Sequence, residues 1–201
     1  MLPTPISKRS EFAEMIDYSE ETIADSHRLA DVDINLLSDG DMTDAEKLFR
    51  NVVTYADIVI RDAQSRGFID GDWTAELDNA KCRAGACHYG REEITLSKVW
   101  MVHADLAEIE NTILHELAHA CTFENSSEHG HGEEWKNWCG KIGMTRIERC
   151  TDRPSEMPKG KYEAWCPTCE QPKGYRWRLN KNIRRYSLCS DCRTAIKWRE
   201  L

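Results

Sequence analysis

Residues 105–123 read DLAEIENTILHELAHACTF, and this stretch decides the fold of the chain. Its apolar residues recur at spacings of three and four, which predicts an amphipathic α-helix from about Asp105 to Phe123. An α-helix turns by about 100° per residue, so His115 and His119, four positions apart, lie on one face. Their two imidazoles can therefore reach a common metal ion.

Glu116 completes a His-Glu-x-x-His pattern, which on a helix is typical of a zinc site with a glutamate general base. Because it follows the first ligand directly, Glu116 is placed to take a proton from a water at the ion rather than to bind the ion itself. Peptide-bond hydrolysis is the reaction expected of such a site. The alternative is a surface helix that carries these residues by chance, and the amphipathic context disfavours it.

A catalytic zinc needs a third protein ligand and one open position. Metzincins would place a third histidine six residues after His119, where this chain has Asn125, so that class is excluded. We expect His131 to be the third ligand, because Gly130 and Gly132 on either side let the backbone turn sharply toward the metal. The alternatives in the same segment are Glu128, His129, Glu133 and Glu134.

The segment before this helix contains one further helix and two short strands. Thr43 and Glu46 form a capping box, and the apolar spacing that follows predicts a helix ending near Gly67. Strands are expected at Trp73–Leu77 and Glu93–Leu96.

The segment after the catalytic helix predicts a supporting helix, with Trp135, Trp138, Cys139 and Ile142 on one face and Gly143 at its end. At the other end of the chain, residues 1–40 are acidic and weakly patterned apart from a possible helix around Glu11–Ile16. We interpret residues 1–40 as an extension, residues 41–150 as the catalytic domain, and residues 151–201 as a linker and a small second domain.

Four of the nine cysteines form two Cys-x-x-Cys pairs near the end of the chain. The pairs are Cys166 with Cys169 and Cys189 with Cys192, and their separation matches that of a four-cysteine zinc site. Four thiolates fill a tetrahedron, so this second zinc should be structural. Disulfide or redox pairs are the alternative.

The charge of the chain is divided unevenly. The total is −8, but residues 158–201 carry eleven Lys/Arg against four Asp/Glu, so this part is +7 and the remainder −15. Basic residues alternate there with aromatic ones, which suits phosphate contact and base stacking on single-stranded DNA. The alternative is that the aromatic residues only pack the small domain. The candidate nucleic-acid-binding residues are Arg176, Trp177, Arg178, Arg184 and Arg185.

The sequence GHGEEW at residues 130–135, following the His-Glu-x-x-His helix, resembles the SprT-like family, which includes the Spartan proteases of DNA–protein crosslink repair. Residues 84–87 and 93–97 are also similar to the glycine turn and the strand that precede the catalytic helix in that family. The resemblance extends over about residues 45–198.

The resemblance implies that His115, His119 and His131 bind the catalytic zinc and that Glu116 is the general base. It implies an α+β fold: a minimal zincin-like metallopeptidase domain, with helices packed on a small sheet, followed by a β-rich four-cysteine zinc ribbon. The expected function is zinc-dependent cleavage of proteins associated with DNA. A DNA-independent processing or lysis peptidase and a non-catalytic zinc-containing nucleic-acid-binding module remain as alternatives.

The remaining expectations concern location and the other cysteines. No apolar run approaches the roughly 18 residues of a membrane span, and no signal-peptide pattern is present, so we expect a cytoplasmic protein, nucleoid-associated or in the host cytoplasm if viral. Cys121 and Cys139 should be buried thiols. Cys82, Cys87 and His88 should bind no metal, and Cys150 has no assigned role.

Overall fold

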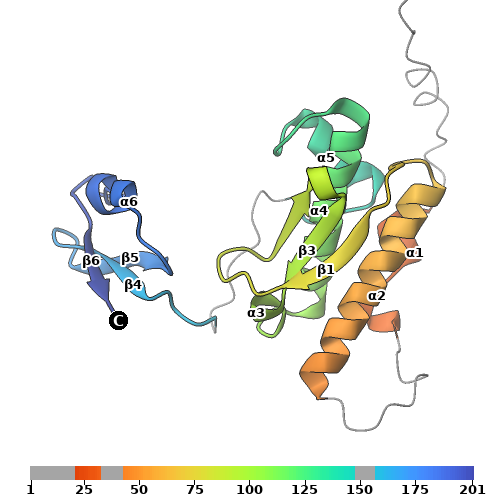
Figure 1. Cartoon of the computed structure of the whole chain (residues 1–201). Coiled ribbons are helices and arrows are strands. Elements are labelled where there is room, and N and C mark those ends of the chain that lie inside the picture. Colours follow the sequence, from red (N-terminus) through yellow and green to blue (C-terminus); the bar gives the residue numbers. More distant parts are fainter. Residues whose placement is uncertain (1–20, 33–42, 148–156) are drawn as a thin grey trace, which may run out of the picture.

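A small sheet with two long helices makes up the larger part of the computed structural model, which describes residues 21–32, 43–147 and 157–201 (Figure 1). The strands are β1 (Thr74–Asp78), β2 (Gly85–His88) and β3 (Glu93–Ser97). They are ordered β1-β3-β2, with β1 parallel and β2 antiparallel to the central β3. Strand β2 therefore lies at one edge of this sheet.

Helix α2 (Asp44–Ser65) packs on β1, where it supplies much of the core. The capping box predicted from Thr43 and Glu46 is present, and a reversed backbone at Gly67 (φ 69°) follows the end of the helix. Both ends of α2 are therefore as the sequence predicted.

Helix α4 (Leu106–Ser126) packs on β2 and β3 and contacts α2. Its N-cap is Asp105, whose side chain accepts a hydrogen bond from the Glu108 backbone N–H. Helix α5 (Glu133–Lys141) follows and packs on α4, while the short α3 (Lys98–Met101) and a 3₁₀ turn (Tyr89–Arg91) complete this body. The helices predicted for residues 105–123 and around Trp135–Ile142 are therefore both present.

The first and third strands agree with the sequence to within about one residue, but the second was missed. Residues 84–87 were expected to be a glycine turn, whereas Gly85–His88 form strand β2. In the register of the sheet, Gly85 pairs with Leu96 and Cys87 with Ile94. The glycine is needed for close approach of another element to the strand, and not for a turn.

Residues 21–32 also depart from the expectation, since they do not form a simple extension. They contain α1 (Ile23–Ser26) and a 3₁₀ turn (Leu29–Asp31), and Ile23, Ala24 and Leu29 are buried in the core. The helix expected near Glu11–Ile16 lies outside the described residues.

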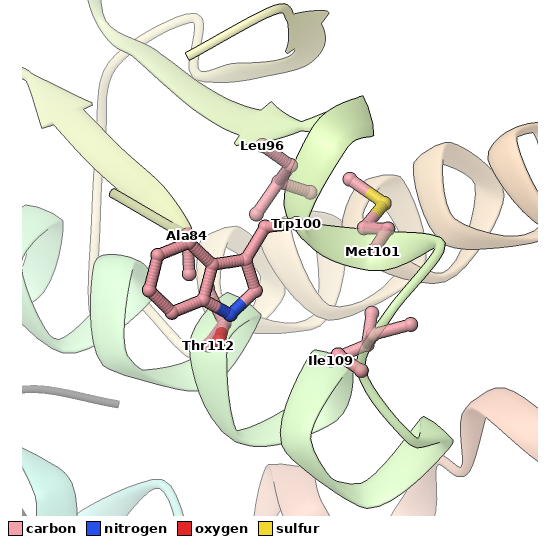
Figure 2. Close-up of a pocket in the computed structure, with 7 residues that line it drawn as sticks. Ala84, Leu96, Trp100, Met101, Ile109 and Thr112 are labelled. Carbon is pink, nitrogen blue, oxygen red and sulfur yellow. The ribbon is translucent and has the colours of Figure 1, made fainter. Parts of the chain in front are cut away.

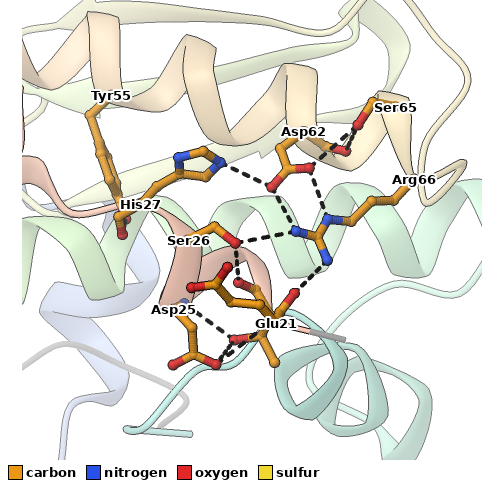
Figure 3. Close-up of polar contacts among 9 residues, drawn as sticks. Glu21, Asp25, Ser26, His27, Tyr55, Asp62, Ser65 and Arg66 are labelled. Carbon is orange, nitrogen blue, oxygen red and sulfur yellow. Dashed lines mark hydrogen bonds and ion pairs between the residues drawn. The ribbon is translucent and has the colours of Figure 1, made fainter. Parts of the chain in front are cut away.

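Polar contacts fasten this N-terminal segment to α2. Figure 3 shows the Asp62 carboxylate between His27 and Arg66: it lies 3.0 Å from Nε2 of His27 and accepts a 2.8 Å hydrogen bond from Nε of Arg66. Arg66 also donates to the backbone carbonyl of Glu21 at 2.6 Å. The segment is therefore held by both burial and charge.

The C-terminal part is a second three-stranded sheet of β4 (Tyr162–Cys166), β5 (Gln171–Arg176) and β6 (Lys197–Glu200) in the order β5-β4-β6, all antiparallel. A short helix, α6 (Lys181–Tyr186), lies between β5 and β6 in the sequence. The mixed α+β fold with a small β-rich C-terminal unit is confirmed. Within the described residues, no helix is both long enough and apolar enough to cross a membrane.

Candidate functional site

Three histidines converge on one point beside α4. Nε2 of His131 lies 3.0 Å from Nε2 of His115 and 3.2 Å from Nε2 of His119. A single ring nitrogen can share a proton with only one neighbour at a time, so three such atoms facing each other fit a common cation. Nitrogens bound tetrahedrally at a Zn–N distance of about 2.0–2.1 Å would be about 3.3–3.4 Å apart, close to the observed spacing.

One buried aromatic side chain, that of Trp135, packs against all three imidazoles. Trp135, on α5 and 1% exposed, has its ring centroid 4.8 Å from that of His115, 5.6 Å from that of His119 and 4.6 Å from that of His131. Burial, with the proximity of the other two imidazoles, lowers the pKa of His119 to about 3. His119 is therefore neutral at ordinary pH, the form in which an imidazole can bind a metal.

The loop between α4 and α5 brings His131 to the other two histidines. Ser127 ends α4 with a left-handed backbone (φ 57°), and Gly130 also has a positive φ (91°). These reversals turn the chain back across α4. The glycine at position 130 was correctly identified from the sequence as necessary for the turn.

Glu116 lies under strand β2 rather than in solvent, and it is only 8% exposed. A Cβ atom on Gly85 would lie 2.9 Å from Cγ of Glu116 and 3.1 Å from Cγ2 of Thr112, so only glycine allows β2 to come this close to α4. The backbone N–H of Cys87 donates a hydrogen bond to the Glu116 carboxylate. The edge strand and the candidate base are thus directly connected.

The environment of Glu116 shifts the pKa of its carboxyl toward neutral pH. Burial raises the pKa of its carboxyl to about 7, while the Cys87 hydrogen bond and the charge of Arg83 act in the opposite direction. A pKa near the working pH is the property expected of a general base.

A small apolar pocket lies one helical turn before Glu116. Thr112 and Ile109 of α4 line it together with Ala84, Leu96 and Trp100, and its free volume is about 10 Å³, enough for one water molecule. Figure 2 shows the Trp100 indole among these side chains. None of the three histidines lines this pocket.

The four ribbon cysteines form a second cluster. Sγ of Cys166 lies 3.4 Å from Sγ of Cys192, and Sγ of Cys169 lies 3.8 Å from Sγ of Cys189. Sulfurs bound tetrahedrally at a Zn–S distance of about 2.3 Å would be about 3.8 Å apart. All four thiols are free. These four cysteines therefore form no disulfide in this structure, which is contrary to the disulfide alternative.

The two Cys-x-x-Cys pairs have matching backbones. Cys169 is followed by Glu170 (φ 52°) and Cys192 by Arg193 (φ 61°), so each pair ends in a left-handed residue. Hydrogen bonds from Thr194 lower the pKa of Cys192 to about 6. Hydrogen bonds with Cys192 and Cys166 raise the pKa of Cys169 to about 12, so Cys192 is the first of these two thiols to ionise. A lowered thiol pKa favours the thiolate, which is the form that binds metals.

Each of these groups, the three histidines and the four cysteines, could therefore hold a metal ion. The comparison with known families adds to this geometry, because the SprT-like family model matches residues 51–157, more than half of the chain. The chain belongs to the SprT-like family. No curated protein and no solved structure matches it.

The SprT-like match contains all of the histidine group and none of the cysteine group, which lies beyond residue 157. Of the alternative third ligands, His129 packs against other aromatic rings, and Glu128, Glu133 and Glu134 are not part of either group. Cys82, Cys87 and His88 belong to neither group, Cys121 and Cys139 are buried as expected, and Cys150 lies outside the described residues.

The candidate nucleic-acid-binding residues lie on the surface of the ribbon, with one exception. Arg176, Arg178, Arg184 and Arg185 are exposed. Trp177 is half-buried, and Nζ of Lys81 lies 4.4 Å from its ring centroid.

Sequence reasoning missed two features of this SprT-like site. Trp135 was assigned to helix packing alone, and Gly85 to a turn. The aromatic residue at the start of α5 has no local signal for its contact with the histidines, since the contact depends on how α5 packs on α4.

Proposed function

We propose that this chain is a zinc-dependent endopeptidase that cleaves proteins associated with DNA. The observation that supports it is the convergence of His115, His119 and His131 beside Glu116, which lies on the same helix as two of them. SprT-like membership supports the same reaction class. The four cysteines of the ribbon would hold a second, structural zinc, since four thiolates leave no open position.

The residues fit a catalytic zinc. Three imidazole ligands leave one of four tetrahedral positions open, as catalytic sites require. Zinc held there would supply Lewis-acid polarisation of the scissile carbonyl and of a water molecule.

Glu116 moves the proton in this proposal. As the water oxygen bonds to the scissile carbon, the carboxylate accepts the water's proton, and it then donates this proton to the leaving amine as the C–N bond breaks. In the metal-free protein, burial raises the pKa of this carboxyl to about 7, so the group is neither a very weak base nor a very weak acid at neutral pH. The Cys87 N–H fixes the carboxylate on the side of β2.

Strand β2 suits the binding of an extended substrate. It pairs only with β3 within the described residues, so its other edge has no strand partner there. An extended segment added at such an edge gains main-chain hydrogen bonds whatever its sequence. Because Glu116 lies against the same strand, a peptide bound there would place its backbone near the candidate base.

Cleavage of casein or histones, measured with and without single-stranded DNA, tests the proposal. The wild type should cleave and be stimulated by DNA, whereas Glu116→Gln should keep its metal and lose cleavage. If the rate of cleavage were the same with and without DNA, the chain would instead be a processing or lysis peptidase. A wild type that binds zinc but never cleaves would identify a non-catalytic module. Metal analysis should give two zinc ions per chain.

The ribbon is the proposed contact with nucleic acid. Arg176, Arg178, Arg184 and Arg185 are exposed, and within the part of the chain that the structure describes none of them pairs with a carboxylate. The guanidinium of Arg185 lies 5.6 Å from the ring centroid of Tyr186, which is 66% exposed. This arrangement offers both a phosphate contact and an aromatic face.

A pair of charge-matched variants tests this contact. Arg184→Gln with Arg185→Gln should weaken binding to single-stranded DNA and reduce the slope of log K against log salt by about 1.4, or about 0.7 for each lost phosphate contact. The control is Lys47→Gln with Arg61→Gln, two exposed cations on α2. If both double variants weakened DNA binding equally, the effect would come from the loss of positive charge alone. That outcome would contradict a specific contact by the ribbon.

A further inference from the structure

Three aromatic rings from three separate segments meet beside the histidine group. The ring centroid of Tyr89 lies 4.7 Å from that of Phe123 and 4.6 Å from that of His129, and the Phe123 and His129 centroids are 5.5 Å apart. These separations are within the range of favourable aromatic contact. We refer to Tyr89, Phe123 and His129 as the aromatic clamp.

Each member of the aromatic clamp adjoins a different part of the candidate metal site. Tyr89 directly follows β2, the strand whose Cys87 N–H reaches Glu116. Phe123 lies one helical turn after His119 on α4. His129 lies in the α4–α5 loop, two positions before His131. The clamp therefore joins the edge strand, the helix and the loop at one place.

The loop is the element of the site that most needs such a contact. Backbone hydrogen bonds hold its two ends, from Ser127 N–H to the Phe123 carbonyl and from Lys136 N–H to the Gly132 carbonyl. Between them, Ser127–Gly130 are exposed, and Gly130 is a glycine with a positive φ (91°), the residue type with the most backbone freedom. Packing of the His129 ring on Tyr89 and Phe123 fixes this middle part against the body.

We propose that the aromatic clamp positions His131 for metal binding, so that Tyr89, Phe123 and His129 are positioning residues of the histidine site. His115 and His119 are already fixed by α4, and the third ligand is the one whose place depends on a loop. Ordering that loop before the metal arrives removes an entropic cost from binding. The inference rests on the proposed zinc site, but it does not depend on what the site cleaves.

The inference also gives His129 a role distinct from metal binding. Its ring faces Tyr89 and Phe123, and it is not part of the histidine group. A phenylalanine at position 129 could make the same ring contacts but could not bind a metal. Substitution by phenylalanine therefore separates a positioning role from a ligand role.

The test measures metal affinity of the full chain directly, by competition with a chromophoric chelator and by cobalt(II) absorption. Thiolate ligands give charge-transfer bands that imidazoles do not, so the cysteine group serves as an internal control in each sample. His129→Ala and Tyr89→Ala should weaken metal binding at the histidine site by about 10- to 100-fold, the range for residues that support a ligand. The cysteine site should be unchanged.

His129→Phe and Tyr89→Phe are the matched controls and should keep wild-type affinity. The inference is overturned if the alanine variants bind metal at the histidine site as tightly as the wild type, or if the phenylalanine variants lose as much affinity as alanine. Should Tyr89→Ala fail to fold, the exposed position of His129 lets His129→Ala decide alone. A wild type that binds no metal at the three histidines would instead refute the proposed function.

Discussion

Gly85 and Glu116 approach each other so closely that a Cβ atom on the glycine would lie 2.9 Å from Cγ of the glutamate. The contact joins the edge strand β2 to helix α4, which carries the three residues of the His-Glu-x-x-His pattern. It also determines where the carboxylate can lie, since the strand covers one side of it.

Gly85→Ala should therefore displace Glu116 or push β2 away from α4. Thr112 cannot yield easily, because its Cγ2 lies 3.1 Å from the added atom and its branched side chain is stiff. We expect a loss of about 1–3 kcal/mol in stability from overpacking and a fall of about 10- to 100-fold in kcat from the displaced base. Peptidase assays and urea unfolding measure the two effects.

The matched control is Gly90→Ala. A Cβ atom there would meet nothing within 4 Å, and the residue has no positive φ. This variant should retain both activity and stability. If Gly85→Ala behaved the same way, the close contact would have no bearing on the site.

The pH dependence of stability should reveal the buried carboxyl in the metal-free protein. Glu116 holds its proton up to about pH 7 when folded, against a reference value of 4.5, so the folded state binds more protons between these values. Stability contributed by this group therefore falls as pH rises through that window. His119 acts oppositely, because its lowered pKa costs stability as pH falls below about 6.5.

Comparing the wild type with Glu116→Gln separates the two groups, since His119 is common to both. In chelator, the glutamine variant should be the more stable protein above pH 7, and its advantage should vanish toward pH 4.5. Denaturant unfolding at a series of pH values measures the difference. Parallel curves for the two proteins would show that Glu116 is not perturbed by burial.

Removing one ribbon cysteine should abolish metal binding by the four-cysteine group and leave metal binding by the three histidines intact. Cys189 is fully buried, and Cys189→Ser should lower the zinc content from two to one per chain and unfold the ribbon, whose small sheet has little core of its own. Metal at the three histidines should remain. Cys82→Ser, at an exposed cysteine outside both groups, is the control. Loss of both metals on mutating Cys189 would mean that the two sites are not independent.

The N-terminal segment should contribute to stability although it lies outside the SprT-like match. Ile23 is fully buried, and the Ala24 backbone N–H donates to the Ile142 carbonyl at 3.0 Å. Ile23→Ala should cost about 2–5 kcal/mol. Val102→Ala, at a residue 48% exposed, should change stability by less than about 0.5 kcal/mol. Urea midpoints compare them, and equal midpoints would show that the segment packs only loosely.

The sequence predicted those parts of the molecule that depend on neighbouring residues. The capping box at Thr43, the apolar spacing of the helix that begins near Asp105 and the helix end at Gly143 act over three or four positions, so their signals are local. The His-Glu-x-x-His pattern is local too, because one helix fixes its geometry.

The parts that were missed depend on contacts between distant segments. The need for glycine at position 85 comes from Glu116 and Thr112 of α4, the contact of Trp135 with the three histidines comes from the packing of α5 on α4, and the burial of Ile23 comes from the core that it enters. No periodicity within a short window contains that information. The same holds for His129, whose nearness to His131 in sequence suggested a ligand, whereas its ring packs on Tyr89 and Phe123.

Trp135 belongs to the hydrophobic core and touches all three imidazoles, so the metal centre and the interior share one side chain. Occupancy and folding are consequently linked through mass action. An ion that binds only the folded form, present at 100 times its dissociation constant, would add about 2.7 kcal/mol to the stability of the body. Removal of an ion bound at the three histidines would therefore lower the melting temperature of this body.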